Sequence, residues 1–239
     1  MKRQDVLETP FNSTYFQEYY TGYRDKFEDL FRSEQQFLKD LIVNNKSVID
    51  VGCASGGMYQ IVKKINSEIS YSGVDIAKDL IAIAKKKYPE VDFRIGDGTG
   101  LPFETNSYDA VISFGTTVHD QDYENLIKES YRISSKAFLF DMRIVPEMPS
   151  INDVTKGYVN DGAGLNYPYI LANAKEFVQF LKSLSPSPKK ISIYGYWGKA
   201  NEFTQLPPGY EQLCMCGVLI EKGIGTNITE LHFDIPFEL

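Results

Sequence analysis

The stretch from Lys46 to Gly57, Lys-Ser-Val-Ile-Asp-Val-Gly-Cys-Ala-Ser-Gly-Gly, constrains the fold of this chain more than any other. It begins with a β-branched apolar run that suits a strand buried on both faces of a parallel sheet, formed by Val48, Ile49 and Val51. Small residues then remove side-chain bulk where the strand turns into a helix, namely Gly52, Ala54, Gly56 and Gly57. Such a turn lets a ligand lie against bare backbone, with amides of the helix N-terminus pointing at it. Asp50 adds a carboxylate beneath the turn.

This stretch fits two motifs and does not choose between them by itself. The pattern Gly52-x-Ala54-x-x-Gly57 passes for a relaxed dinucleotide-binding fingerprint, which is a weak signal when it stands alone. The pattern Asp50-x-Gly52-x-Ala54-x-Gly56 resembles the first motif of the class I S-adenosylmethionine-dependent methyltransferases, with alanine in place of the middle glycine. That departure is mild, because alanine adds only one methyl group. The later strands have to decide.

Two further acids stand at the carboxyl ends of predicted strands. Asp75 follows a strand predicted over 69–74, about twenty residues past the glycine turn, where a carboxylate typically holds a ribose diol. Asp97 follows a strand predicted over 91–95 and has a glycine on each side. The carboxyl ends of successive strands in parallel βα units meet at one edge of the sheet, so both acids point to a single cleft.

The segment that begins at Gly96 makes the family resemblance specific. Gly-Asp-x-x-x-Leu-Pro-Phe over 96–103, then Ser-Tyr-Asp-x-Val over 107–111, closely resembles the middle motifs of class I methyltransferases, and dehydrogenases lack this signature. The resemblance implies an α/β, Rossmann-like fold with a seven-stranded, mostly parallel sheet and helices on both faces. It also implies S-adenosylmethionine as cofactor, S-adenosylhomocysteine as product, and a set of cofactor-binding residues: Asp50, Gly52, Ala54, Gly56, Asp75, Ile76, Asp97, Gly98 and Phe114.

The whole chain, residues 1–239, is predicted to be one methyltransferase domain with four parts. These are a helical lid (1–45, with a helix over 26–43), the cofactor-binding core (46–145), a long substrate-side segment (146–173), and a region that completes the sheet and ends in a tail (174–239). The tyrosines of the lid suit packing on the domain as well as covering a ligand. Arg24 either is solvated or reaches a ligand carboxylate.

Composition excludes several classes of partner. The net charge is −7 and there is no basic run, which argues against a nucleic-acid backbone as main partner. No segment has the length and apolarity of a membrane span or a signal sequence. The chain has three cysteines, in no zinc or disulfide pattern, which indicates reduced thiols, a cytoplasmic protein and no metal site. The oligomeric state does not follow from these observations.

The expected chemistry aligns a nucleophile with the cofactor's methyl group and, where the nucleophile is a hydroxyl, removes its proton, for which His119 is the candidate base. It lies just past the fourth predicted strand, and a histidine pKa near neutrality suits a general base. The alternative is a helix-entry histidine that bonds to the backbone, with Asp120, Asp141 or a tyrosine as the base. Candidate acceptor contacts in the long segment, which otherwise pack as a surface loop, are Tyr158, Asn166, Tyr167 and Tyr169.

The sequence therefore predicts methyl transfer to a small polar acceptor, first of all O-methylation of a sugar or glycan precursor. A small aromatic or amine acceptor is the alternative within the same activity. A catalytically silent S-adenosylmethionine-binding module is an alternative of another class, and an NAD-dependent oxidoreductase is disfavoured because no hydride-handling pair is evident.

Overall fold

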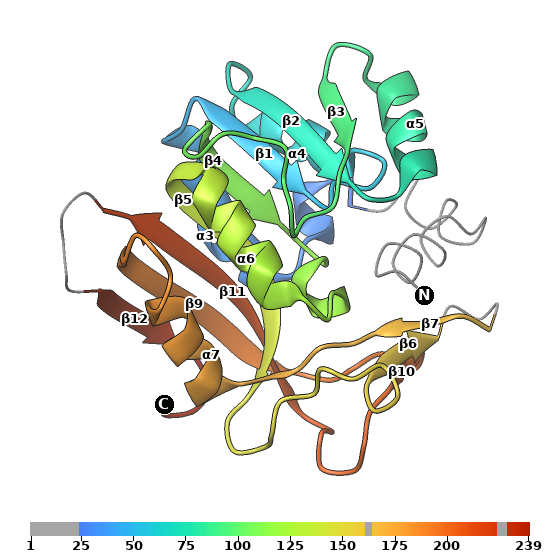
Figure 1. Cartoon of the computed structure of the whole chain (residues 1–239), viewed down its shortest axis with the longest axis vertical. Helices are drawn as coiled ribbons and strands as arrows, with labels where there is room; N and C mark the ends of the chain where they lie inside the picture. The colour runs from blue at the N-terminus through green and yellow to red at the C-terminus, as the bar shows by residue number, and fades with distance from the viewer. Residues whose placement is uncertain (1–23, 161–163, 224–228) are drawn as a thin grey trace.

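One large, mostly parallel sheet organises the molecule (Figure 1). The structure is a computed structural model that describes residues 24–160, 164–223 and 229–239. The sheet has nine strands in the order β12-β9-β11-β5-β4-β1-β2-β3, with β8 paired to β5 off this path. Its parallel half consists of β1 (Ser47–Val51), β2 (Ser70–Asp75), β3 (Asp92–Ile95), β4 (Tyr108–Ser113) and β5 (Ser134–Val145).

One strand in the other half of the sheet runs against the rest. β11 (Leu213–Lys222) is antiparallel to both β5 and β9 (Pro188–Gly198). β12 (Glu230–Asp234) then runs parallel to β9, and the short β8 (Ala172–Asn173) runs parallel to β5. The seven predicted strands are all present as β1–β5, β9 and β11. The tail supplies the added strand β12, because its residues pair in register with the exposed edge of β9.

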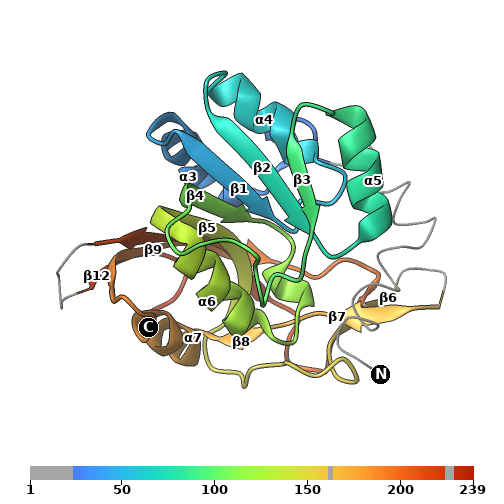
Figure 2. The ribbon, with the colours of Figure 1, turned by 45° about the horizontal axis from the view of Figure 1, so that its top comes forward.

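Helices cover both faces of the sheet, and two apolar clusters show which helix belongs to which face (Figure 2). One face packs against α3 (Arg32–Val43), α4 (Gly57–Ile65) and α5 (Lys78–Lys87). The opposite face packs against α6 (Tyr123–Ile133) and α7 (Ala174–Lys182). Successive side chains of β1 show the division, since Val48 joins the first cluster and Ile49 the second. Burial on both faces explains why these strands are almost continuously apolar.

The segment 146–173 contains more regular structure than the predicted loop. β6 (Tyr158–Asn160) and β7 (Asn166–Pro168) join β10 (Thr204–Gln205) in a separate three-stranded sheet of order β10-β6-β7. In Figure 1 this small sheet lies beyond the carboxyl ends of the central strands, on the side from which a ligand would be covered. The segment after β9 thus comes to lie beside the segment that follows β5.

The amino-terminal part differs from the single predicted helix over 26–43. A 3₁₀ turn, η1 (Phe27–Asp29), is followed by an extended residue at each of Leu30 and Phe31, and α3 begins only at Arg32. The carboxylate of Glu34 accepts a hydrogen bond from the Phe31 amide at 2.8 Å, which fixes the start of α3. Most of the predicted lid, with its tyrosines, lies outside the described residues.

Candidate functional site

A cavity of about 440 Å³ opens at the carboxyl ends of β1, β2 and β4, the edge that the sequence indicated. Part of the wall is formed by the glycine turn and the acids at the strand ends, and the rest by residues of β5, β6, β7, β10 and β11 and of the segments that follow β4 and β9. Ligands in open α/β sheets bind in this position, because helix N-termini and strand ends converge there.

The turn after β1 has an unusual backbone at three positions. Gly52, Ala54 and Gly56 have φ angles of +85°, +46° and +81°, the left-handed region that favours glycine. The amide of Gly52 donates to the Val74 carbonyl at 2.8 Å. A Cβ at Gly52 would stand 1.9 Å from Oγ1 of Thr116, so no other residue fits there. Ala54 occupies a conformation that is costly for a residue with a Cβ.

Asp75 holds this turn and also faces the cavity. Its Oδ2 accepts the Ala54 amide at 2.8 Å, and its Oδ1 accepts the Ala77 amide at 2.8 Å. Burial raises the pKa of Asp75 although both amides oppose the rise. Since each carboxylate oxygen has two acceptor positions, the side chain can still accept hydrogen bonds from a ligand diol. The geometry fits the ribose-binding role that the resemblance implied.

Asp50 lies deeper, at the end of β1. Its side chain is buried, lines the cavity and accepts a hydrogen bond from the Tyr71 hydroxyl at 2.8 Å. Burial raises its pKa to about 7 although this hydrogen bond opposes the rise. A cation in the cavity would favour the ionised form of Asp50.

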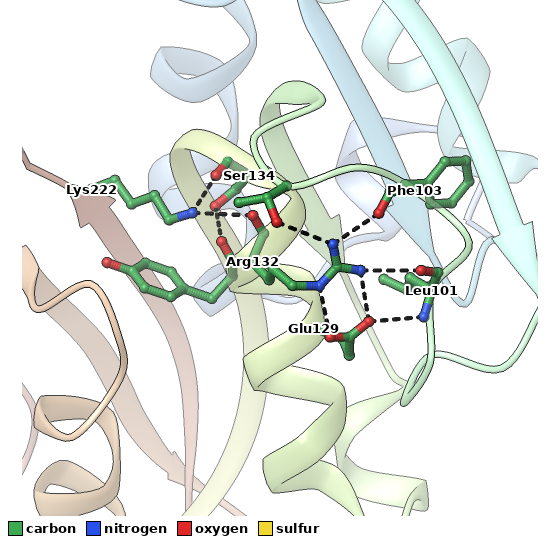
Figure 3. A network of polar contacts seen from close by, with 8 residues as sticks. Leu101, Phe103, Glu129, Arg132, Ser134 and Lys222 are labelled. Atoms are coloured by element: carbon green, nitrogen blue, oxygen red, sulfur yellow. Dashed lines mark hydrogen bonds and ion pairs between the residues drawn. The ribbon is translucent and has the colours of Figure 1, made fainter.

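The loop that carries Asp97 is fixed at both ends. Asp97 Oδ1 accepts the amide and the hydroxyl of Thr99, at 2.9 and 2.8 Å. Farther along, the Arg132 guanidinium donates to the carbonyls of Leu101 and Phe103, and it pairs with Glu129 (Figure 3). Glu129 in turn accepts the Leu101 amide at 3.0 Å. Helix α6 thereby fixes the end of the loop that is farther from the cavity, at Leu101 and Phe103.

All the predicted cofactor-binding residues except Gly56 line the cavity. Gly56 instead caps α4, and a Cβ there would stand 2.8 Å from the ring of Phe93. Its role is therefore to let α4 start close to the sheet. The motif pattern did not distinguish the glycine that borders the ligand space from the glycine that packs beneath it.

His119 ends the 3₁₀ turn η2 (Thr117–His119) and lines the cavity. Its Nδ1 lies 2.8 Å from the Pro168 carbonyl oxygen, which can only accept, so Nδ1 carries the proton. In the neutral ring, Nε2 then holds a lone pair. Burial lowers the pKa of His119 to about 4, so the predicted pKa near neutrality is wrong. The ring also packs edge-to-face on Tyr167, with centroids 4.9 Å apart.

Two of the four predicted acceptor contacts reach the cavity. Tyr167 and Tyr169 line it, whereas Tyr158 and Asn166 do not. In the small sheet Tyr158 pairs with Pro168. The side-chain oxygen of Asn166 accepts a hydrogen bond from the side-chain nitrogen Nδ2 of Asn160 at 2.8 Å. Strand alternation in β6 and β7 brings Val159 and Tyr167 to the cavity in their place.

Arg24, for which the sequence left two alternatives open, is largely buried, and several other cavity residues carried no signal in the sequence. Arg24, whose side chain is only 11% exposed, lines the cavity and pairs with Glu34 at 2.9 Å. Burial raises the pKa of Glu34 to about 7 against the opposing charge of Arg24. Asp141, an alternative base, is fully buried and is not part of the lining. The remaining unforeseen lining residues on this side are Phe31, Arg143, Asn160, Lys199, Asn201, Phe203, Thr204 and Met215.

Two further findings bear on the predicted absences. Among the described residues, no group of three or more histidine, cysteine or acidic side chains is placed to hold a metal ion. In the same part of the chain, no helix has the length and apolarity needed to cross a membrane.

Comparison with known proteins identifies the central region. The family model described as "Methyltransferase domain" matches residues 48–136. Over these residues the chain is similar to the class I S-adenosylmethionine-dependent methyltransferases. A protein of Invertebrate iridescent virus 6, named as methyltransferase 235L, is 34% identical to it over 95 residues, which cover 39% of this chain and 36% of that protein. The matched stretches span between a third and a half of the first curated relatives.

Solved structures share the fold over most of this chain. The magnesium protoporphyrin IX methyltransferase of Synechocystis PCC 6803, with bound S-adenosylmethionine, aligns with a TM-score of 0.57 at 13% identity, over 93% of this chain and 98% of that one. Phosphoethanolamine N-methyltransferase 2 of Haemonchus contortus, in complex with phosphomonomethylethanolamine and S-adenosylhomocysteine, aligns with a TM-score of 0.62 at 15% identity, over 94% and 61%. Such distant matches establish the common fold.

Proposed function

We propose that this protein transfers a methyl group from S-adenosylmethionine to a small polar acceptor. The observation that carries the proposal is the meeting, in one cavity, of the glycine turn, Asp75 and Asp97 at one end with His119 on the wall beyond them. The residues fit the cofactor, since Asp75 has acceptor positions left for the ribose and the turn exposes backbone to the ligand. Two structural neighbours are described with S-adenosylmethionine or S-adenosylhomocysteine bound.

When bound, the cofactor supplies a methyl group on a positively charged sulfonium, and the methyl–sulfur electron pair stays on sulfur as S-adenosylhomocysteine forms. The protein aligns the acceptor atom with that methyl group and excludes water. Where the acceptor is a hydroxyl, its proton passes to Nε2 of His119, because Nδ1 already carries a proton that it donates to Pro168. The resulting imidazolium keeps its hydrogen bond to the Pro168 carbonyl, which stabilises it.

The wall around His119 supports a polar acceptor. Asn160, Asn201 and Thr204 supply amide and hydroxyl groups, and Tyr167 and Tyr169 supply phenols on flat rings. Such a mixture suits a sugar or glycan precursor, whose faces are apolar and whose edges carry hydroxyls. Phe31, Phe203 and Met215 add apolar area that a small aromatic or amine acceptor would use as well. O-methylation of a sugar is thus the first member of the proposed class to screen.

Calorimetry with S-adenosylmethionine, S-adenosylhomocysteine and NAD tests the cofactor assignment. We expect binding of the first two and none of NAD. Tight binding of NAD alone would overturn the proposal. Binding of S-adenosylhomocysteine without turnover, over a screen of sugars, nucleotide sugars, aromatic alcohols and amines, would instead assign a catalytically silent module.

A further inference from the structure

The charged residues that line the cavity come from different parts of the sheet. Three of the lining carboxylates, Asp50, Asp75 and Asp97, lie at the carboxyl ends of β1, β2 and β3. Two of the lining cations, Arg143 in β5 and Lys199 after β9, come from strands on the other side of β4, whereas Arg24, before α3, lies close enough to Asp50 for their charges to interact. The fourth lining carboxylate, Asp120, directly follows His119.

Arg143 presents an unused pair of donors in this cavity. Its Nη1 donates to Asp141 Oδ2 at 2.8 Å and to the Met142 carbonyl at 3.2 Å. Asp141 is itself committed, because its Oδ1 accepts the Gly115 amide at 2.6 Å. The Arg143 Nε is buried without a hydrogen-bond partner, and no described residue accepts from Nη2. The residue is only 4% exposed, so water does not readily replace the missing acceptor.

The Nε and Nη2 donors form one edge of the planar guanidinium, which is the geometry that matches two oxygens of a carboxylate or a phosphate. The ring of Phe31 lies against the guanidinium, with Cζ 5.4 Å from the ring centroid, and limits its movement. The ion pair with Asp141 fixes it from the other side. Arg143 is thus held rigidly while its two donors Nε and Nη2, the fork, have no acceptor. Little side-chain entropy would therefore be lost when an anion binds to this fork.

Two further residues of the cavity wall, Tyr169 and Lys199, can also attract an anion. Tyr169 lines the cavity close enough to Arg143 for their charges to interact, and a phenol can donate a further hydrogen bond to an anion. Lys199 lies on the exposed rim after β9, and no described carboxylate stands within 4 Å of its ammonium. An exposed cation at a cavity mouth attracts anions over a longer range than a hydrogen bond.

We propose that the methyl acceptor carries an anionic group, a carboxylate or a phosphate, which binds the Nε–Nη2 edge of Arg143 with support from Lys199 and Tyr169. This inference rests on the proposed function, because it assigns a property to the acceptor of that reaction. It places the charge of the acceptor at Arg143, which is close enough to His119 for its charge to act on the ring, and leaves Nε2 of His119 for the nucleophile. Sugar acids, sugar phosphates and small aromatic acids all belong to the class.

Calorimetry on the protein saturated with S-adenosylhomocysteine tests the inference with matched probes. One series is glucose, glucuronate and glucose 6-phosphate, and the other is benzyl alcohol, benzoate and phenyl phosphate. We expect the anionic members to bind about 10- to 100-fold more tightly than the neutral member of the same series, since hydrogen bonds to charged groups exceed neutral ones. The carboxylate and phosphate arms distinguish which anion the fork prefers. Equal affinity within both series, or no binding of any anionic member, overturns the inference.

Two variants locate the effect. Arg143→Lys keeps the charge beside Asp141 and removes the fork, and Lys199→Met changes only an exposed rim residue. We expect the first to remove most of the anionic preference and the second to lower it severalfold. Arg94→Met and Lys189→Met are the matched controls, because both side chains are exposed and outside the cavity lining. A preference that survives in both cavity variants contradicts the assignment.

The binding of S-adenosylhomocysteine to every variant is measured first. If the unmodified protein does not bind S-adenosylhomocysteine, the proposed function itself is refuted. Normal cofactor binding with no anionic preference would refute only the acceptor class. The two failures are therefore distinguishable in the same experiment.

Discussion

The two ends of the cavity are built by different means. The cofactor end comes from successive βα units between β1 and β4, and two of its acids accept backbone amides, Asp75 from Ala54 and Ala77 and Asp97 from Thr99. The acceptor end comes from separate segments near residues 24–31, 119, 143, 159–169 and 199–215, and it presents side chains. A backbone-built site tolerates divergence around it, whereas a side-chain site changes specificity with each substitution.

The difference also appears in the charges. Acids at the cofactor end suit a cofactor with a sulfonium and ribose hydroxyls, and the two arginines that line the cavity are each held by one buried carboxylate, Glu34 or Asp141. Each arginine is thus balanced by an acid that is fully buried. A buried charge without its partner would be strongly destabilising, so both ion pairs are needed to keep guanidinium groups in the wall.

The largest expected effect separates the two ends by chemistry. His119→Ala should lower turnover by about 10²–10⁴ and leave the affinity for S-adenosylhomocysteine unchanged, because only the proton acceptor is lost. Steady-state kinetics and calorimetry measure the two quantities. His232→Ala is the control, since that residue lies exposed on β12. If turnover is undiminished, His119 is not the proton acceptor, and its role is limited to the hydrogen bond with Pro168.

The second change acts on the cofactor end. Asp75→Ala should weaken S-adenosylhomocysteine binding by about 1–3 kcal/mol, because ribose hydroxyls lose their acceptor. Calorimetry measures the dissociation constant, and a thermal scan checks whether the turn at Ala54, which also loses its partner, remains folded. Asp92→Ala is the control, as this carboxylate is exposed and pairs with Arg94 at 2.7 Å. An unchanged dissociation constant would place the ribose elsewhere.

A smaller effect concerns the backbone of the turn. Ala54→Gly relieves a left-handed conformation that costs about 1–2 kcal/mol for a residue with a Cβ, while glycine loses about 0.5–1 kcal/mol more on folding. We expect the free energy of unfolding, measured by urea denaturation, to rise by at most about 1.5 kcal/mol. Ala84→Gly, inside α5, is the contrasting control and should lower it by about 1 kcal/mol or more. Destabilisation by Ala54→Gly would show that the methyl group packs usefully.

The smallest expected effect concerns the pH dependence of turnover, in which no rise or fall at about pH 6–7 should come from the titration of His119. A His119 pKa of about 4, below the ordinary value of 6.5, keeps the ring neutral above about pH 5, so its charge state does not change between about pH 6 and 8. The Nε2 lone pair should therefore be available throughout that range, although the lowered pKa makes the ring a weaker base than an ordinary histidine, and activity should fall through its protonation only near pH 4. Turnover measured at saturating cofactor against pH checks this.

Any limb near pH 7 should belong to the buried carboxyls Asp50 and Glu34, whose pKa values are raised to about 7. Such a limb should persist in His119→Ala, in whatever residual activity remains, and Asp50→Asn should alter it. The ionised form of Asp50 favours a cationic cofactor, so cofactor affinity should rise with pH through this range. A limb near 6.5 that vanished with His119 would contradict the lowered pKa.

The extent of prediction differs between the two ends for a physical reason. Asp50, Asp75, Asp97 and the glycine turn were recognisable because each lies at the end of a strand whose apolar pattern is legible, and parallel strands bring those ends together. Tyr158 and Asn166 were misplaced because one step along a strand reverses the face of a side chain. Arg143 was hidden because its partners, Asp141 and Phe31, become its neighbours only after packing.

The amino-acid sequence by itself determined the fold family, the core strands of the sheet and the cofactor edge, since these depend on local periodicity and on residues close together in the chain. Only the tertiary structure decided which glycine borders the ligand space, the tautomer and lowered pKa of His119, and the cationic wall formed by Arg143 and Lys199. Those properties depend on burial and on contacts between segments distant in the chain, and neither burial nor such contacts can be read from the order of the residues.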